Sequence, residues 1–410
     1  MAENTLSIQM MVFLFGILLV LSIFLRTGLK NLGIPSLIGF MALGFLIRWG
    51  DDQWRFFTPE VEEVFRFLAE IGLFTLLFRV GLESNLKGLL NQFRHASLIW
   101  AGNIVFSGIP GYAVAAWLLD FGTIPAIFVG VALTATSVGV SLAVWQEQKI
   151  TQSPTGRLLL DVAEMDDISG IILMTLLLSA VSGVEGNVSQ ITPGALGQTL
   201  GAILVKLALF GAVCVLFSRY VEERITRFFA EKTHSPGPMI VVAGLGFVIA
   251  GMGALLGFSL AIGAFFAGLV FSRDPEAVKL DASFSSLYEI FSPFFFIGIG
   301  LHMDPRSLTS ALGLGGVLFV LAVAGKLVGN GVLSLAVTDP VSALLISVSM
   351  VPRAEIAMVI MQKGHDLGAW AVPDAVFSGM VLVSLATCVI SPAVLRMLLK
   401  RWPQKKPEPE

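Results

Sequence analysis

Long runs of apolar residues, separated by short polar connections, recur from one end of the chain to the other. Lipid offers no hydrogen-bond partner to a backbone amide, so a run that crosses a bilayer must be helical, and roughly 20 residues cross a core of about 30 Å. About thirteen runs approach that length, near residues 7–26, 33–49, 62–83, 96–119, 124–147, 154–182, 195–221, 239–256, 259–271, 287–301, 308–337, 341–362 and 375–400. The pattern predicts an all-α polytopic membrane protein.

Basic residues concentrate in every second connection, and this asymmetry predicts the orientation, because Lys and Arg are retained on the cytoplasmic side. If the N-terminus is outside, the outer connections hold only Arg48, Arg55, Arg306 and Lys363, and most other basic residues lie in inner connections or in the tail. The first run is expected to be a retained span, because its leading segment MAENTLS contains no basic residue. We expect an integral protein of the cell (inner) membrane with a cytoplasmic C-terminus.

The composition argues against soluble chemistry. Hydrophobic residues make up 55% of the 410 and charged residues 13%, which is typical of membrane proteins. The longest polar connection, 219–238, is too short for a catalytic domain, and the four histidines lack the spacing of a metal site. Cys214 and Cys388 lie in apolar runs, where a packing role is expected. We expect a transporter and not an enzyme, with no cofactor, no resident metal and no nucleic-acid partner.

Four acids stand at membrane depth in the segment LLLDVAEMDDISGIILMTL, residues 158–176: Asp161, Glu164, Asp166 and Asp167. A charge at the bilayer centre costs from about 2.5 to more than 10 kcal/mol, so such residues pair with each other or line a polar path. Neighbouring helix residues point about 100° apart, so Asp166 and Asp167 need separate partners. Adjacent buried carboxylates raise each other's affinity for protons, and this pair therefore favours a site that exchanges protons for a cation.

Three of these acids are spaced by three residues and line one face of the predicted helix. Asp161, Glu164 and Asp167 rise along that face from the cytoplasmic side toward the middle of the membrane. The strip indicates an approach route for a cation. For Asp161 and Glu164, interhelical ion pairs are the alternative.

A buried cation site also needs neutral oxygens, which membrane proteins obtain most readily where a helix breaks. The run 124–147 contains Thr134, Thr136, Ser137 and Gly139 near its middle. The run 341–362 contains Pro352, which removes a backbone donor and loosens the preceding turn. The two interrupted runs are the fifth and the twelfth, the positions expected for equivalent elements of an inverted repeat. Packing is the alternative role for the hydroxyl groups.

The basic residues that could pair with these acids come late in the chain. Lys326, in LAVAGKLVGNGV, is either the structural counterion of one aspartate or a group that releases that aspartate when a cation arrives. Arg353 and Glu355, in VPRAEIAMV, are expected to form a local charge pair that stabilises the second broken helix.

Several stretches together are specific for one family: IGLFTLLFRVGLESNLKGLL, ALTATSVGVSL, DDISGIIL, LGFSLAIGAFFAGLVFSR, PFFFIGIGLHMDP, AGKLVGNG and MVPRAEIAMVI. Over nearly its full length the sequence resembles the cation:proton antiporter superfamily, in particular its NapA-type and Kef-type branch. The resemblance implies a homodimer of thirteen-span chains with an inverted-repeat fold like NhaA and NapA, in which two broken helices cross. It also implies scaffold and dimer helices at 1–95 and 239–307, moving core helices at 96–182 and 308–400, a linking span and cytoplasmic loop at 183–238, and a cytoplasmic tail at 401–410.

The same resemblance implies residue roles. Asp167 looks like the main ion ligand and Asp166 like the partner of Lys326, while Arg353 and Glu355 match the charged residues of the twelfth span. Thr136 falls at the crossing of the broken helices. Asp161 and Glu164 depart from the family, in which small or apolar residues are expected, so the approach to this site is more acidic.

The predicted mechanism is competition between protons and a monovalent cation for the aspartate pair, with elevator-type alternating access. Two acids predict two protons exchanged for each Na⁺, and the resemblance likewise associates an aspartate pair with electrogenic exchange. Such a transporter serves pH and sodium homeostasis. Alternatives are a K⁺/H⁺ antiporter of the Kef type, a passive cation channel and a non-transporting scaffold. The sequence leaves the choice between Na⁺, K⁺ and Li⁺ open.

Overall fold

A computed structural model describes residues 2–31, 34–54, 57–84, 97–182, 193–222, 224, 225, 228, 237–272 and 277–404. All regular secondary structure in this part of the chain is helical, which confirms the all-α prediction. Within the described residues, 7 segments are long and apolar enough to cross a membrane. The count of thirteen spans stays a prediction.

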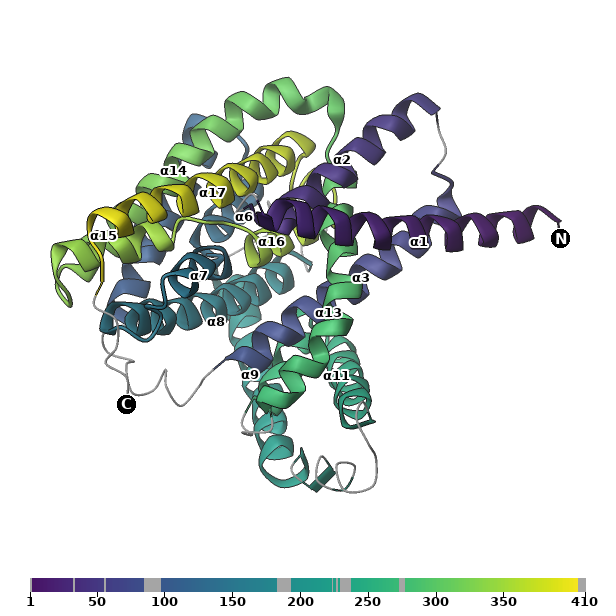
Figure 1. Cartoon of the computed structure of the whole chain (residues 1–410), viewed down its shortest axis with the longest axis horizontal. Coiled ribbons are helices and arrows are strands. Elements are labelled where there is room, and N and C mark those ends of the chain that lie inside the picture. The colour runs from purple at the N-terminus through teal and green to yellow at the C-terminus, as the bar shows by residue number, and fades with distance from the viewer. Residues whose placement is uncertain are drawn as a thin grey trace. The chain divides into compact units, whose positions relative to one another are not determined.

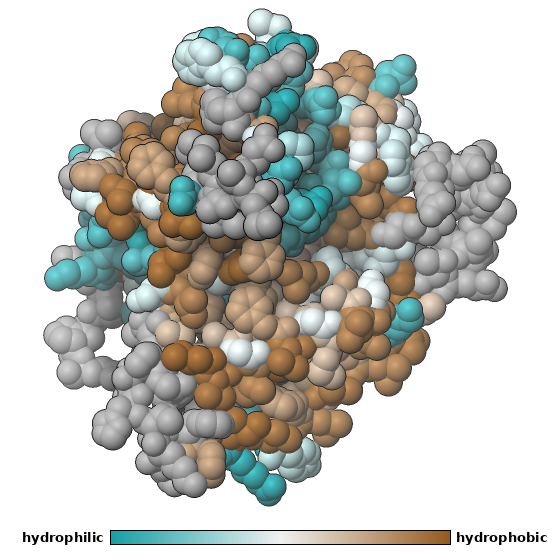
Figure 2. Space-filling model, turned by 90° about the vertical axis from the view of Figure 1, so that its right-hand side faces the viewer, coloured by the Kyte–Doolittle hydropathy of each residue, from teal (hydrophilic) through white to brown (hydrophobic). Residues whose placement is uncertain are grey.

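Large apolar side chains are exposed on the surface of these helices. Broad apolar patches cover the face drawn in Figure 2, and Leu255 and Trp117 are 89% and 80% exposed. Monomeric soluble proteins rarely expose contiguous apolar patches larger than a few hundred Å². Helices with such surfaces are suited to contact with lipid.

The chain divides into two compact units, each assembled from two stretches that are distant in sequence. Unit 1 comprises residues 1–84 and 201–305, and unit 2 comprises residues 85–200 and 306–410. The predicted division into scaffold, core and linker segments concerns function and stays a prediction.

Unit 1 is built around α3, which packs against α12 and α13. Its helices (Figure 1) are α1 (Ala2–Asn31), α2 (Ser36–Trp54), α3 (Pro59–Glu83), most of α9 (Pro193–Phe217), the π-helical turn Ser218–Glu222, α11 (Gly237–Leu255), α12 (Leu260–Phe271) and α13 (Ala277–Leu301). Small residues allow membrane helices to approach closely. A Cβ atom added to Gly268 would lie 2.1 Å from the Phe78 carbonyl oxygen, and one added to Gly81 would lie 2.2 Å from that of Phe265.

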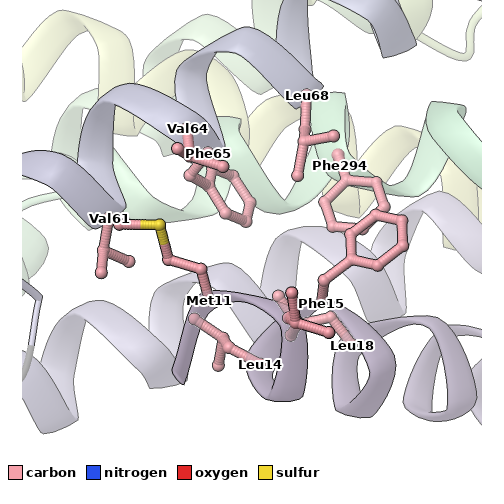
Figure 3. Close-up of a pocket in the computed structure, with 10 residues that line it drawn as sticks. Met11, Leu14, Phe15, Leu18, Val61, Val64, Phe65, Leu68 and Phe294 are labelled. Carbon is pink, nitrogen blue, oxygen red and sulfur yellow. The ribbon is translucent and has the colours of Figure 1, made fainter. Parts of the chain in front are cut away.

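A cavity of about 290 Å³ lies between α1, α3 and α13 of unit 1. Figure 3 shows the side chains that surround it, among them Phe15 and Phe294, whose rings stack. Its lining is apolar: Met11, Val12, Leu14, Phe15, Leu18, Val61, Val64, Phe65, Leu68 and Phe294. None of these side chains offers an oxygen ligand, so this cavity is unsuited to bind a cation.

Unit 2 contains the interrupted helices. Its elements (Figure 1) are the span Ser97–Leu118, which includes the π-helical turn Ile104–Gly108, α5 (Ile109–Ala113) and the π-helical turn Val114–Leu118, followed by α6 (Thr123–Thr134), α7 (Val138–Glu147), α8 (Pro154–Ser182), α14 (Leu308–Ser334), α15 (Pro340–Ser349), α16 (Glu355–Asp366) and α17 (Asp374–Arg401). A 3-10 turn, Pro305–Ser307, precedes α14. α14 packs against both α15 and α17.

Both predicted interruptions are present in unit 2. α6 ends at Thr134 and α7 begins at Val138, with Ala135 in an extended conformation between them. α15 ends at Ser349 and α16 begins at Glu355, because Pro352 lacks a backbone donor and disfavours helical geometry in the residue before it. The Ser137 amide donates to the Pro352 carbonyl at 2.8 Å. The two interruptions therefore lie against each other.

The span Ser97–Leu118 approaches α14 closely through small residues. A Cβ atom on Gly329 would lie 2.7 Å from the Gly102 carbonyl oxygen, and one on Gly325 would lie 2.9 Å from the Ser107 hydroxyl. Gly329 lies against Gly102 and Gly325 lies against Ser107, so residue numbers increase in opposite directions along the two helices. The two helices therefore run antiparallel. This contact brings Asn103 to the level of Lys326.

Candidate ion-binding site

Asp166 is the centre of a buried polar cluster in unit 2. Its side chain is only 1% exposed and accepts hydrogen bonds at both carboxylate oxygens. Asn103 Nδ2 donates to Oδ1 at 2.5 Å, and the Thr136 hydroxyl donates to Oδ2. Lys326 Nζ lies 3.2 Å from the same Oδ2 and completes a buried ion pair. The charge of Asp166 is thus balanced inside the unit.

Lys326 also binds the C-terminal end of α6. Its ammonium group donates to the Thr134 carbonyl at 2.8 Å and to the Thr136 hydroxyl at 2.5 Å. The last carbonyls of a helix have no intrahelical partner and carry partial negative charge. The interruption after Thr134 therefore supplies a backbone ligand for the lysine at membrane depth, and Asn103 Nδ2 shares that carbonyl at 2.8 Å.

Arg353 binds the next backbone carbonyl of the first interruption, that of Ala135. Its side chain is fully buried, and Nη1 donates to the Ala135 carbonyl at 2.7 Å while Nη2 donates to the Ala322 carbonyl of α14 at 3.2 Å. Its own amide donates to the Thr387 hydroxyl of α17 at 3.1 Å. Arg353 consequently ties the second interruption to α14, to α17 and to the first interruption.

The prediction that Arg353 and Glu355 form a local charge pair was wrong. Among the contacts of the described residues, Glu355 accepts a hydrogen bond from the Ser137 hydroxyl, while Arg353 donates to backbone carbonyls. Arg353 lies in the non-helical connection and Glu355 begins α16, so their side chains reach different partners. An acid in the first turn also suits the positive end of the helix dipole.

The other acids of α8 differ from Asp166 in exposure. Asp161, Glu164 and Asp167 are each partly exposed, whereas Asp166 is buried. Their spacing of three residues predicted that Asp161, Glu164 and Asp167 would share one face of the helix. Their common partial exposure fits that geometry. Their roles as ion ligand or approach route stay predictions.

The three predicted hydroxyl ligands are each engaged within the protein. The Thr134 hydroxyl donates to the Val131 carbonyl of its own helix at 2.7 Å. Thr136 donates to Asp166 and Ser137 donates to Glu355. The structure brings Thr136 into contact with Asp166, and a cation-binding role for all three residues stays a prediction.

Asn103 belongs to this cluster and was not predicted from the sequence. It is fully buried, and its side-chain oxygen has no hydrogen-bond partner among the described residues. It directly precedes the π-helical turn Ile104–Gly108, and such turns occur frequently at functional sites. A lone amide in the apolar run AGNIVFSGIP was the only sequence signal.

Unit 2 contains a buried ion pair at the point where two interrupted helices meet, and its outer surface is apolar. This arrangement is typical of membrane proteins that translocate ions. Comparison with known proteins narrows this class. The family model described as sodium/hydrogen exchanger, transmembrane, matches residues 15–401. The chain belongs to the sodium/hydrogen exchanger family of cation:proton antiporters, which confirms the predicted resemblance.

Individual relatives agree with this membership. The high-affinity Na⁺/H⁺ antiporter NhaS3 of Synechocystis sp. is 28% identical over 348 residues, covering 82% of this chain and 72% of that protein. The glutathione-regulated potassium-efflux system protein KefC of Enterobacter sp. is 30% identical over 313 residues, covering 74% of this chain and 46% of that protein.

A solved structure shows the same fold. The sodium proton antiporter MjNhaP1 of Methanocaldococcus jannaschii matches with a TM-score of 0.70 at 14% identity, covering 96% of this chain and 97% of that chain. At that identity the likeness concerns the fold alone. The family membership makes cation/proton exchange by an integral membrane transporter the class of activity.

Proposed function

We propose that this protein is a secondary active antiporter that exchanges Na⁺ for H⁺ at Asp167, with Asp166 and Lys326 as its charged partners. The observation that carries the proposal is the contrast between two adjacent carboxylates. Asp166 is buried and held by Asn103, Thr136 and Lys326, whereas Asp167 is partly exposed on the neighbouring face of α8. A partly exposed carboxylate is more accessible to an ion than a buried one.

The mechanism is competition for this carboxylate. Asp167 binds either a proton or the cation, and only the neutralised or loaded form crosses the membrane, because an uncompensated charge is costly at the bilayer centre. When a cation binds beside it, the Asp166–Lys326 pair feels an added positive charge. That repulsion weakens the hold of Lys326 on Asp166 and couples cation binding to proton release.

Unit 2 carries every residue of the proposed site, and we propose that it is the moving core of an elevator-type transporter. Unit 1 then serves as the scaffold and as the interface of a homodimer. The proposed orientation places the N-terminus outside and the C-terminus in the cytoplasm of the cell (inner) membrane. This assignment is supported by the asymmetry of basic residues in the connections.

Potassium is a second candidate for the transported cation. The 30% identity to a protein named as a potassium-efflux system supports it. Thermal-shift titrations of the purified protein with NaCl, KCl, LiCl and choline chloride would separate the candidates. The transported ion is expected to raise the melting temperature of the parent, and the Asp167→Asn variant is expected to lose that stabilisation.

The full chain in sealed proteoliposomes containing a pH dye tests the proposed function. A sodium gradient is expected to drive a pH change in the parent and none in Asp167→Asn. Asp120→Asn is the matched control, because Asp120 is exposed with a φ of 52°, a left-handed conformation that Asn tolerates. Exchange at the parental rate in Asp167→Asn would overturn the site. Sodium flux without proton counterflow would indicate a channel.

A further inference from the structure

A polar stripe continues along α14 from the ion pair. Lys326, Asn330 and Ser334 are four residues apart, so they lie on one helix face. All three are 0% exposed. At 1.5 Å per residue the stripe covers about 12 Å and ends at the last residue of α14, next to Leu335, which is 52% exposed. The stripe therefore leads from the buried ion pair toward the connection between α14 and α15, where Asp339 is exposed.

The polar atoms of this stripe beyond Lys326 are not satisfied by the protein. Both amide atoms of Asn330 and the hydroxyl of Ser334 have no hydrogen-bond partner among the residues that the structure describes. Each buried polar group without a partner costs about 1–3 kcal/mol. Asn330 and Ser334 do not hydrogen-bond each other, although side chains four apart on a helix have Cβ atoms about 5–6 Å apart, and a water molecule can bridge two polar groups at such positions.

Further polar groups lie at the same level of unit 2. The Ser347 hydroxyl of α15 is 3.5 Å from the position that a Cβ on Gly331 would occupy. The indole N–H of Trp100 is also buried and has no partner within the described residues, and the antiparallel contact of Gly102 with Gly329 sets Trp100 level with the turn that carries Asn330. A buried water needs two to four polar partners. At this level the Ser347 hydroxyl, which donates to the Leu344 carbonyl at 2.9 Å, can still accept a hydrogen bond, and the Trp100 indole can donate one.

We propose that Asn330 and Ser334 hold a chain of water molecules that carries protons between the Asp166–Lys326 pair and the C-terminal end of α14. The inference rests on the proposed function, since it supplies a proton route to the same site. One proton enters the chain at one end and one leaves at the other. Each O–H bond that breaks is replaced by one that forms, so the chain keeps its atoms and its charge.

The chemistry of the stripe favours protons over the cation. Beyond Lys326 it contains no acid, so a cation on this path would have no countercharge at membrane depth. Asn330 offers one donor group and one acceptor group that orient water, and the Ser334 hydroxyl can accept and donate in turn. The cation is expected to use the partly exposed face of α8 instead.

Ser334→Ala and Asn330→Leu test the route in proteoliposomes, and Ser378→Ala is the matched control. Ser378 of α17 is likewise fully buried, and its hydroxyl has no partner within the described part of the chain, but it lies off the stripe. No side chain within the described residues loses a hydrogen bond when one of these polar groups is replaced by an apolar group of similar shape, so the melting temperature should change little. We expect this for all three variants, with sodium-driven proton exchange slowed about tenfold or more in Ser334→Ala and Asn330→Leu and unchanged in Ser378→Ala.

Two results would overturn the route. One is parental exchange in both stripe variants. The other is a fall of melting temperature that accompanies the loss of exchange in both, which would assign Asn330 and Ser334 a packing role. If Asn330→Leu fails to fold, Ser334→Ala decides alone. Absence of exchange in the parent protein is a different outcome, because it removes the proposed function itself.

Discussion

Two identical side chains at adjacent positions acquire different properties from their surroundings. The Asp166 carboxylate faces an amide, a hydroxyl and an ammonium donor inside unit 2. Asp167 is turned by about 100° on the same helix and is partly exposed. The two carboxylates therefore differ in burial and in surroundings, and the proposal that Asp167 is the exchanging carboxylate builds on this difference.

Lys326→Ala is predicted to destabilise the protein strongly. The variant leaves the buried Asp166 without its counter-ion, and breaking a buried pair from one side costs about 3–5 kcal/mol. A thermal melt of the detergent-purified protein, followed by size-exclusion chromatography, measures the loss. The double variant Lys326→Ala, Asp166→Asn removes the uncompensated charge and should recover part of the stability. If Lys326→Ala melts at the same temperature as the parent, the ion pair does not contribute to stability.

The charged members of the site could be predicted from the sequence, whereas Asn103 could not. Asp166 and Lys326 stand out because charges at membrane depth are costly, so their presence alone demands a partner. A neutral amide carries no such signal, since asparagine also occurs in membrane helices as an ordinary packing group. Its role depends on the close approach at Gly102 and Gly329, which is a property of three-dimensional packing.

At the scale of the elements, helix α15 has a well-defined N-terminus. Asp339 is its N-cap and accepts hydrogen bonds from the amides of Val341 at 3.0 Å and Ser342 at 3.1 Å. Pro340 follows at the first helical position, where a missing N–H has no cost. These contacts fix where the first half of the second interrupted helix begins.

Asp339→Ala is predicted to lower the stability by about 1 kcal/mol at neutral pH, the usual cost of losing an N-cap. Hydrogen bonds from Ser342 hold the pKa of the Asp339 carboxyl below its ordinary value of 3.8. The stabilisation is therefore complete above pH 3.8 and is lost as the pH falls through the lower folded pKa. Asp339→Asn keeps the cap at all pH values. Melting curves at neutral pH and below pH 3.8 check this, and equal melting of all three proteins at neutral pH would contradict it.

Gly268→Ala is predicted to destabilise unit 1 by about 1–3 kcal/mol, the usual cost of overpacking. The added methyl would meet the backbone of α3 at the Phe78 carbonyl, 2.1 Å away, and a helix backbone cannot move aside as a flexible side chain can. Gly251→Ala on α11 is the control, because nothing lies within 4 Å of its Cβ position. Alanine also has a higher helix propensity than glycine, so this variant should not be destabilised. Thermal melts of both variants measure the difference. Equal melting temperatures would show that α3 and α12 can separate without cost.

The sequence predicted the interruptions for a local reason and could not predict how they meet. Pro352 and the cluster of hydroxyl residues around Thr136 disfavour continuous helix wherever they occur. The contacts that join the two interruptions, such as Ser137 with Pro352 and Arg353 with Ala135, link residues more than two hundred positions apart. The prediction of an Arg353–Glu355 pair was wrong for the same reason. The two residues are close in sequence, but their side chains bind residues that are distant in sequence.

At the scale of the whole molecule, the site belongs to one unit. Unit 2 is assembled from residues 85–200 and 306–410, and it contains both interruptions, Asp166 and Lys326. Hydrogen bonds and the ion pair connect α6, α8, α14, α16 and α17 within it. The proposed ion ligand Asp167 therefore lies in the same unit as the buried Asp166–Lys326 pair, which is compatible with the proposed movement of this unit as one body.

Exchange is predicted to move net charge. Two protons crossing for one sodium ion transfer one positive charge in the direction opposite to sodium, and a potential of 100 mV then contributes about 2.3 kcal/mol. That energy shifts the ion gradients at which net exchange stops by about fiftyfold. On a solid-supported membrane, a jump in sodium concentration should produce a transient current of opposite sign to sodium entry. The Asp167→Asn variant, which lacks the carboxylate proposed to bind the ion, should give none. A sodium-driven pH change without current would show one-for-one exchange, in which the proton of Asp166 takes no part and its carboxylate serves only to hold Lys326.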